Sequence, residues 1–193
     1  MTTLIIKLCD DHSNVAMHFN DEGVFERSES FTQLRELNDI TDHKLIVLLP
    51  GTSVHMLTAT LPSMSATELQ QAAPNIVEEQ LSEDINGLYF AVGEADSENK
   101  RHIAVIRQTI WDTLIHDLKE NNLSPSLIIP DYLALPIDEE SWTIFCGQPQ
   151  SLVRLGKQQG YACDTNLLET LISLNLNEAA QAPNSVKIIH EPN

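Results

Sequence analysis

The stretch TLIIKLCDDHSNVAMHF, residues 3–19, decides the fold. Two apolar runs, 3–9 and 15–19, flank the polar turn 10–14, and this pattern is typical of a β-hairpin. A similar pattern, WTIFCGQPQSLVRL, recurs at residues 142–155. Each hairpin leads towards a helix. The repetition predicts an α/β protein with mixed sheets, in which one sheet unit is duplicated.

Neither hairpin turn has the residues that bind a nucleotide phosphate. Such turns present several backbone N–H groups to the anion, and glycines allow close approach. The first turn has no glycine, and Asp10 and Asp11 place two carboxylates in it. The second turn, 147–150, has one glycine, no carboxylate for Mg²⁺, and a proline, which has no N–H. We therefore interpret the chain as a non-catalytic binding scaffold and expect no cofactor.

The first half of the pattern reads β-β-β-α-β. Asp21–Gly23 is a turn signal, and Ser30 to Gln33 form a capping box that predicts the start of a short helix. A continuous apolar run before Pro50 predicts a strand buried on both faces. The strands expected in this part are 3–9, 15–19, 24–26 and 44–49.

The next unit reads strand-helix-strand-strand. Its first strand, 54–61, changes its alternation midway, which predicts a bulge. Ser65 and Glu68 form a second capping box. The helix that follows has one apolar stripe, and Pro74 within it predicts a kink. The apolar stripe and the two returning strands are Leu69, Ala72, Ala73, Ile76 and Val77, then 88–92 and 102–107.

The remaining chain repeats the first pattern. Thr109 is expected to cap a helix with Trp111 on its apolar face, and a short strand follows at 127–129. A helix capped by Asp164 is expected to bury Leu167, Leu168, Leu171 and Ile172. The other strands expected here are 142–146, 151–155, 160–163 and 186–189, with a polar linker at 179–185.

Three subdomains follow from this order. Residues 1–51 with 109–138 form the first sheet unit, 52–108 the insert, and 139–193 a second sheet unit that is incomplete. The best boundary between the sheet units is Asp138-Glu139-Glu140.

The composition excludes several classes of ligand. The 11 basic and 28 acidic residues give a formal net charge of −17, which repels nucleic-acid phosphate and anionic lipid headgroups. A protein with a basic docking face is the expected partner, although acidity can also serve solubility alone.

The three cysteines, Cys9, Cys146 and Cys163, show no paired spacing and fit a reducing compartment. The N-terminus lacks a signal-peptide pattern, and no window reaches the roughly 18 apolar residues of a membrane span. We expect a cytoplasmic chain whose membrane anchor, if it has one, lies beyond Asn193.

Four stretches carry a resemblance to a known family. They are Pro50–Ser53, Leu61–Met64, Ala73–Leu81 with Asp84 and 88–90, and IPDYLALP at Ile129–Pro136. In this order they resemble the cytoplasmic domain of the type II secretion system protein L family. That family belongs to the actin-like ATPase superfamily, whose sheet domains are ribonuclease-H-like.

The resemblance implies an adaptor of the inner-membrane platform of the secretion system. Such an adaptor binds the amino-terminal domain of the secretion ATPase and other platform proteins, at the cytoplasmic face of the bacterial inner membrane. It implies a membrane connection only through a segment absent from this chain. Self-association as a homodimer is a further expectation. The alternatives are an actin-like nucleotide-binding ATPase, or a pilus-assembly or cell-division adaptor of the same superfamily.

Four carboxylates and one tyrosine are the candidate partner-binding residues. Glu78, Glu79, Glu83 and Asp84 cluster where the insert helix ends. Consecutive acids at the end of a helix are usually a solvated face, and a docking edge for a basic partner surface is the alternative. Tyr89 is expected to face away from Leu88 and Phe90, where an exposed tyrosine would anchor an interface.

Asp10, Asp11, His12 and His18 could suggest a metal site, but a solvated turn is the better interpretation. No spacing of metal-binding histidines and no G-x-S-x-G nucleophile turn occurs. The sequence therefore predicts no catalytic or metal-binding residue.

Overall fold

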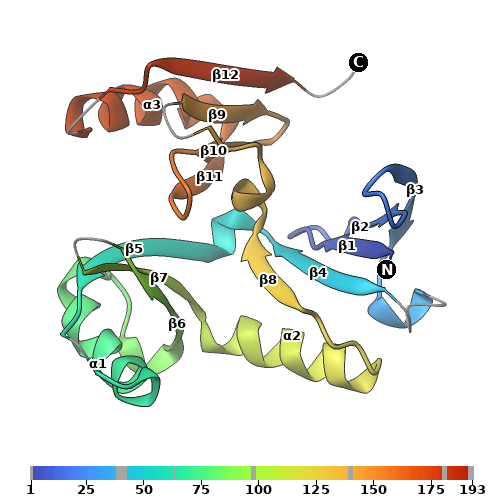
Figure 1. Ribbon diagram of the computed structural model, residues 1–193, viewed down its shortest axis with the longest axis horizontal. Coiled ribbons are helices and arrows are strands. Elements are labelled where there is room, and N and C mark those ends of the chain that lie inside the picture. Colours follow the sequence, from blue (N-terminus) through green and yellow to red (C-terminus); the bar gives the residue numbers. More distant parts are fainter. Residues whose placement is uncertain are drawn as a thin grey trace.

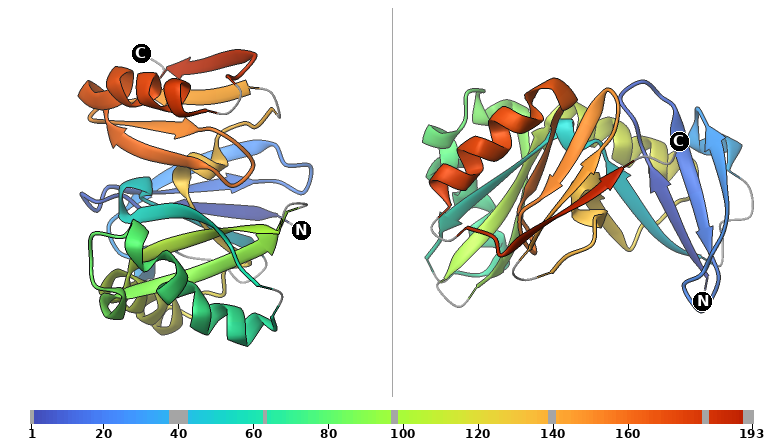
Figure 2. Two further views of the ribbon diagram at one scale, coloured as in Figure 1. Left: turned by 90° about the vertical axis from the view of Figure 1, so that its left-hand side faces the viewer. Right: turned by 90° about the horizontal axis from the view of Figure 1, so that it is seen from above.

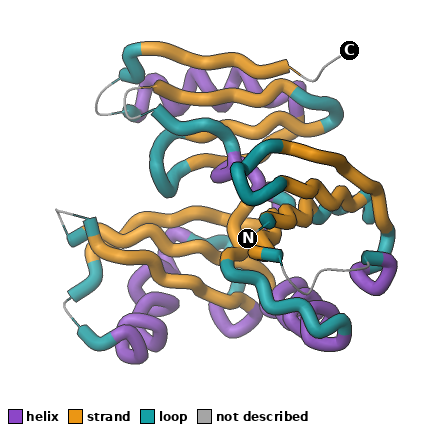
Figure 3. Tube along the Cα trace, turned by 45° about the vertical axis from the view of Figure 1, so that its right-hand side comes forward, coloured by secondary structure: helices purple, strands orange, loops and turns teal. Residues whose placement is uncertain are grey.

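Three sheets make up the protein in the computed structural model (Figure 1). The structure describes residues 2–37, 43–62, 64–96, 99–138, 141–179 and 182–190. Strands predominate in these ranges, and the longer helices lie on the outer sides of the sheets (Figure 3). The chain is an α/β protein with mixed sheets, as the sequence predicts.

The first sheet has five strands in the order β3-β2-β1-β4-β8. β1 pairs antiparallel with β2 and parallel with β4, and β4 pairs parallel with β8. β4 lies between β1 and β8, and three consecutive apolar residues at its end, Val47 to Leu49, are buried. The strand bounds are β1 Thr3–Lys7, β2 Asn14–Phe19, β3 Phe25–Phe31, β4 Lys44–Leu49 and β8 Leu127–Pro130.

The second sheet repeats the first one. Its strand order is β11-β10-β9-β12. Counted along the chain within each unit, the strands therefore lie in the order third, second, first, fourth, which is also the order of β3-β2-β1-β4 in the first sheet. The first and fourth strands are again parallel, so the predicted duplication is confirmed. Helix α3, Leu168–Glu178, lies along one face of this sheet (Figure 2). The strands are β9 Ser141–Cys146, β10 Gln150–Arg154, β11 Gly160–Asp164 and β12 Ser185–His190.

The insert is a three-stranded antiparallel sheet, β5-β7-β6, with helix α1 against it. β5 is Val54–Thr60, α1 Ala66–Val77, β6 Leu88–Ala95 and β7 Lys100–Arg107. Ser65 accepts a hydrogen bond from the Glu68 N–H, and the Glu68 carboxylate accepts one from Ser65 N–H. The predicted capping box is therefore present. The helix continues through Pro74, and Leu69, Ala73 and Val77 are its buried residues.

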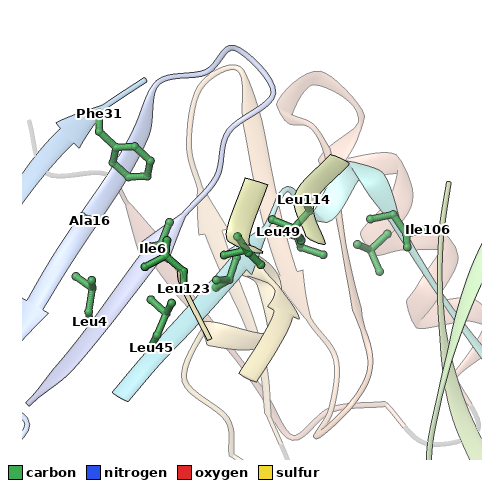
Figure 4. Packing of buried hydrophobic residues seen from close by; sticks show 12 residues of the cluster. Leu4, Ile6, Ala16, Phe31, Leu45, Leu49, Ile106, Leu114 and Leu123 are labelled. Carbon is green, nitrogen blue, oxygen red and sulfur yellow. The ribbon is translucent and has the colours of Figure 1, made fainter. Parts of the chain in front are cut away.

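Two hydrophobic cores hold the first sheet and the insert. The first core joins β1, β2 and β4 to helix α2, Gln108–Glu120, through Leu114 and Leu118 (Figure 4). The second core joins α1 to the insert sheet, where Phe90 and Ile103 meet Leu69. Each fully buried leucine or phenylalanine contributes about 1.5–3 kcal/mol relative to exposure. Ile106 at the end of β7 belongs to the first core, so β7 connects the two.

The predicted helix at Ser30 is wrong. β3 extends to Phe31, because residues 25–31 pair with β2 and Phe31 is buried in the first core. Pairing across the sheet therefore outweighs the local capping signal. A short 3₁₀ helix, Leu34–Glu36, follows instead, and its capping box joins Gln33 to Glu36.

Three other local predictions are also wrong. β5 pairs with β7 in continuous register, so the bulge expected in residues 54–61 is absent; the irregularity lies in β6, after Val92. Arg107, not Thr109, precedes the first turn of α2. A 3₁₀ turn separates Asp164 from α3, Leu167 is exposed, and the other residues expected to be buried, Leu168, Leu171 and Ile172, are only half-buried.

We propose that each sheet is the centre of one of the three predicted subdomains. The boundary predicted at Asp138–Glu140 and the linker predicted at 179–185 lie partly outside the described residues, as does Ser63 of the second family stretch.

Candidate protein-binding surfaces and the hairpin turns

The turn between β1 and β2 is closed by its own residues. Cys9 N–H donates to the Asn14 side chain over 3.0 Å, and Ser13 N–H donates to Asp11 over 3.0 Å. His12 N–H donates to the Cys9 carbonyl oxygen at 3.1 Å. Three backbone N–H groups of this turn are thus already hydrogen-bonded within it, where a phosphate would need several free donors. The Ser13 hydrogen bonds also lower the pKa of Asp11, which keeps a negative charge in the turn.

The turn between β9 and β10 is packed against Thr165. The Thr165 hydroxyl donates to the Gly147 carbonyl at 2.6 Å, and Thr165 N–H donates to the Pro149 carbonyl at 3.0 Å. A side chain at Gly147 would lie 2.7 Å from the Gln150 carbonyl oxygen. Two carbonyl oxygens of this turn, those of Gly147 and Pro149, are therefore hydrogen-bonded to Thr165.

A buried carboxylate joins the first sheet to the connection between the two sheet units. Gly51 lies just after β4, and its N–H donates to Asp131 over 3.0 Å. Asp131 begins the 3₁₀ helix η5, Asp131–Ala134, and its other oxygen is 3.6 Å from the Lys7 ammonium. Burial raises the pKa of Asp131, and Lys7 and the N–H donors oppose that shift. The family stretch IPDYLALP contains this carboxylate, but the sequence did not reveal its partners.

Tyr132 fills the space between two glycines of different sheet units. A Cβ at Gly51 would lie 2.6 Å from one side of the ring, and a Cβ at Gly160 of β11 would lie 2.7 Å from the other. The tyrosine is fully buried, and its hydroxyl has no hydrogen-bond partner among the described residues. Burial raises the pKa of this hydroxyl. The ring therefore packs the first sheet unit directly against the second.

Arg154 of β10 also holds the segment that connects the two sheet units, at residues 133–135. Its guanidinium donates to the carbonyl oxygens of Leu133 and Leu135, each at 2.5 Å. It also donates to Gly156 at 3.1 Å and Lys157 at 3.0 Å. A planar guanidinium can serve several carbonyls at once. With Tyr132, it holds η5 against the second sheet.

The four predicted carboxylates lie close together along the chain but differ in their contacts. All are exposed. Glu83 accepts two hydrogen bonds from Arg107, at 3.1 and 3.0 Å, and these lower its pKa. Asp84 accepts from Asn86 N–H at 2.9 Å and caps a short 3₁₀ helix. Glu78 and Glu79 lie in a further 3₁₀ turn after α1. Their role in binding stays a prediction.

Tyr89 is not the exposed residue that the sequence predicts. The alternation is present, because Phe90 is buried in the second core and Tyr89 faces the first. That side is covered by α2, where the Tyr89 ring stacks on Trp111 with centroids 4.3 Å apart and planes 9° from parallel. Tyr89 is half-buried and contributes to packing, so its role as an interface anchor also stays a prediction.

Three of the four candidate metal-site residues have other partners. Asp10 accepts from the Thr52 hydroxyl at 2.8 Å, and Asp11 accepts from Ser13. His18 is buried and lies 3.0 Å from Glu29 of β3. Within the described ranges, no three metal-ligating side chains form a group.

A groove that the sequence did not predict runs between helix α2 and the first hairpin turn. It has a volume of ≈1130 Å³. It is lined by one face of α2 and by residues 32–35, and Leu8 and Leu49 also line it. Residues 109, 110, 113, 114 and 117 have the spacing of one helix face, so the sequence contains a signal for the α2 wall of this groove. The opposite wall, residues 32–35, comes from a distant part of the chain, and the sequence does not show that the two walls face each other.

None of the described helices is both long and apolar enough to cross a lipid bilayer.

Comparison with known proteins places this chain among secretion proteins. The model of one family, described as type II secretion system (T2SS), protein L, matches residues 16–189. The type II secretion system protein L of Dickeya chrysanthemi is 30% identical over 127 residues, which are 66% of this chain and 32% of that protein. The protein of the same name from Vibrio cholerae is 27% identical over 139 residues, covering 72% and 34%. The chain thus spans about a third of the length of these relatives.

Solved structures show the same fold. The cytoplasmic domain of EpsL, an inner membrane component of the type II secretion system of Vibrio cholerae, has a TM-score of 0.83 at 17% identity and covers 100% of this chain and 84% of that one. A PilM–PilN type IV pilus biogenesis complex has a TM-score of 0.56 at 15% identity, and the match covers 91% of this chain and 65% of that one. A Bacteroides thetaiotaomicron protein of unknown function with an actin-like ATPase fold has a TM-score of 0.53 at 10% identity. That match covers 100% of this chain and 83% of the other. The predicted actin-like fold is confirmed.

Proposed function

Because the chain belongs to the type II secretion system protein L family, we propose that it is a non-catalytic adaptor of the secretion apparatus. It binds the amino-terminal domain of the secretion ATPase and couples that domain to the inner-membrane platform. Its mechanism is positional. Two sheet units joined through Tyr132 and Arg154 form a scaffold on which a partner is held.

The closure of the first hairpin turn is the observation that carries this proposal. A nucleotide would require N–H donors there, and Asn14, Asp11 and the Cys9 carbonyl accept those hydrogen bonds. An incoming phosphate would also meet the carboxylates of Asp10 and Asp11. Binding of a basic protein surface is the interaction that a net charge of −17 favours.

Co-elution with the purified ATPase amino-terminal domain tests this function. The two domains are expected to migrate as one species in size-exclusion chromatography at low salt. They should separate as ionic strength rises, because salt screens attraction between exposed charges. Absence of a complex at low salt, with both domains folded by circular dichroism, would contradict the adaptor proposal.

An actin-like nucleotide-binding ATPase is the second candidate function. It is favoured by the fold likeness to a protein described as having an actin-like ATPase fold. Titration calorimetry with Mg-ATP separates it from the adaptor, for which no binding heat is expected. Micromolar binding of Mg-ATP would support the ATPase.

An adaptor of pilus assembly or cell division is the third candidate, and the fold likeness to PilM–PilN favours it. Family membership favours secretion instead. We propose the cytoplasmic face of the inner membrane as its location, and the other platform proteins and a second copy of the chain as further partners.

A further inference from the structure

The groove beside α2, here called the α2 groove, is apolar at its centre. Leu8, Leu49 and Leu114 lie in it, and Leu49 and Leu114 also belong to the first core (Figure 4). Leu34 contributes from the opposite wall. Ile110, on the first turn of α2, keeps 38% of its surface exposed. Leu49 and Leu114 are each only 6% exposed, so the apolar surface open to a partner belongs to Ile110 and to the half-buried Leu8 and Leu34. A partner side chain in this groove would cover that surface, which water now contacts.

One end of the α2 groove is acidic. Asp117 and Glu120 line it where α2 ends, and the carbonyl end of the helix adds partial negative charge there. Asp10 lies in the hairpin turn at the groove's other boundary. Arg35 and His12 are the residues among its lining that can carry positive charge. Negative charge therefore predominates, and it is concentrated beside the last turn of α2.

The dimensions of the α2 groove suit a polypeptide segment. Helix residues from Thr109 to Asn121 line it, and a stretch of that length is ~18 Å long at 1.5 Å per residue. This length accommodates about five or six extended residues or three helical turns. The volume of ≈1130 Å³ exceeds the 300–1000 Å³ typical of small-molecule sites, and the groove is open to solvent.

We propose that the α2 groove binds a linear segment of a partner protein, in which apolar side chains are followed by lysine or arginine. The apolar side chains lie over Leu8, Leu34 and Ile110, and the basic ones meet Asp117 and Glu120. This inference rests on the proposed adaptor function, because it specifies how a partner is held. The charge decides the occupant: a second copy of this acidic chain would meet like charge, and a phosphate or nucleic acid would be repelled.

A peptide array tests the occupant. Overlapping 15-residue peptides from the secretion ATPase amino-terminal domain and from the other platform proteins serve as probes, and labelled wild-type chain is applied. The peptides bound most strongly are expected to contain at least two apolar residues within four positions and two basic residues at one end. Their dissociation constants are then measured by fluorescence anisotropy. An array without bound peptides, or with binding unrelated to this pattern, would overturn the proposal.

Substitutions locate the bound peptide. Ile110→Asp and Thr113→Trp, at two exposed positions of the groove face, are expected to weaken binding at least tenfold. The matched control is Ile76→Asp, at a helical isoleucine of similar exposure (41%) on α1. Circular dichroism and the melting temperature confirm that each variant is folded. Equal weakening by Ile76→Asp, or unchanged binding by both groove variants, would place the peptide elsewhere.

A charge reversal tests the orientation. Asp117→Lys with Glu120→Lys is expected to weaken binding at least tenfold and to reduce its dependence on salt. The control reverses Asp164 and Glu169, exposed acids of the second sheet unit. A control that weakens binding as much would show that total charge, not the groove, attracts the peptide.

The inference and the adaptor function fail in different ways. If the whole ATPase domain still co-elutes with the Ile110→Asp variant, the adaptor function stands and the groove is not its site. If neither the domain nor any peptide binds wild-type chain, the adaptor function itself fails. Self-association of wild-type chain that Ile110→Asp abolishes would identify a second copy as the occupant and overturn the peptide proposal.

Discussion

The backbone N–H of Gly51 donates a hydrogen bond of 3.0 Å to the side chain of Asp131, 80 positions further along the chain. Both residues are buried. The bond ties the end of β4 to the start of η5, from which Tyr132 reaches Gly160 in the second sheet. The connection between the sheet units is therefore packed and hydrogen-bonded, which is the basis of the predictions below.

Gly51→Ala is expected to lower the free energy of unfolding by about 1–3 kcal/mol, the usual cost of overpacking. The new methyl group would lie 2.6 Å from the Tyr132 ring, 2.7 Å from the Asp131 carboxylate and 2.9 Å from Ala162. Urea denaturation measures the loss. Gly87→Ala is the control, because nothing lies within 4 Å of a Cβ there. Equal stability of the two variants would contradict the close packing.

Asp131 is expected to make stability depend on pH. Burial raises its pKa above the ordinary value of 3.8, so the folded protein holds this proton more tightly than the unfolded chain does. The stability that the protonated Asp131 contributes is fully present below pH 3.8. It is lost as the pH rises through the pKa that Asp131 has in the folded protein. From pH 4 upward, wild type should therefore lose stability relative to Asp131→Asn, whose amide side chain does not titrate.

Lys7→Met sharpens this measurement. Lys7 lowers the pKa of Asp131, and its removal should extend the loss of stability to higher pH. Urea denaturation at several pH values records both variants. If wild type instead became more stable than Asp131→Asn as the pH rises, the ion pair with Lys7 would outweigh the effect of burial on Asp131.

Tyr132→Phe is expected to leave stability unchanged or to raise it by about 1 kcal/mol, because the hydroxyl is buried without a partner among the described residues. Tyr161→Phe is the matched comparison. Its hydroxyl accepts a hydrogen bond from Asn175 at 3.1 Å, and its removal should cost about 0.5–1.5 kcal/mol. Chemical denaturation gives both values. A clear loss in Tyr132→Phe would mean that the hydroxyl has a partner.

Tyr89→Ala is expected to lower stability by about 1–3 kcal/mol, because it removes a half-buried ring and its stacking on Trp111. Tyr89→Phe keeps the stack and should be close to neutral. Trp111 fluorescence should report the change in exposure. If Tyr89→Ala kept full stability but lost binding of the ATPase domain, the tyrosine would be the interface anchor that its sequence position suggested.

Local periodicity predicted most of the fold correctly. The succession of strands and helices along the chain and the buried positions Leu69, Ala73 and Val77 of α1 follow from repeats of two and 3.6 residues, which the sequence displays directly. Ile76, also expected on the apolar stripe, is 41% exposed, so that part of the prediction is wrong. The predicted helix at Ser30 failed because β2 offers partners for residues 25–31, and that pairing depends on the whole sheet. Capping signals alone contain no information about such partners.

The candidate sites were less accessible from sequence. Glu83 gave no sign that Arg107 would bind it across the insert, and the exposure of Tyr89 depended on where α2 would lie. The α2 groove has the same origin, since its two walls come from residues 32–35 and 109–121. Contacts between distant segments decide each of these features.

The parallel pairing of β4 with β8 has a consequence for biosynthesis. Ser126 bonds to the carbonyl of Leu45, 81 positions earlier, so one edge of the apolar strand β4 has no neighbour until the whole insert has been translated. At the usual 5–20 residues per second this takes on the order of ten seconds. During that time the nascent chain on the ribosome presents an open apolar edge, and chaperones that cover it would raise the yield of soluble protein.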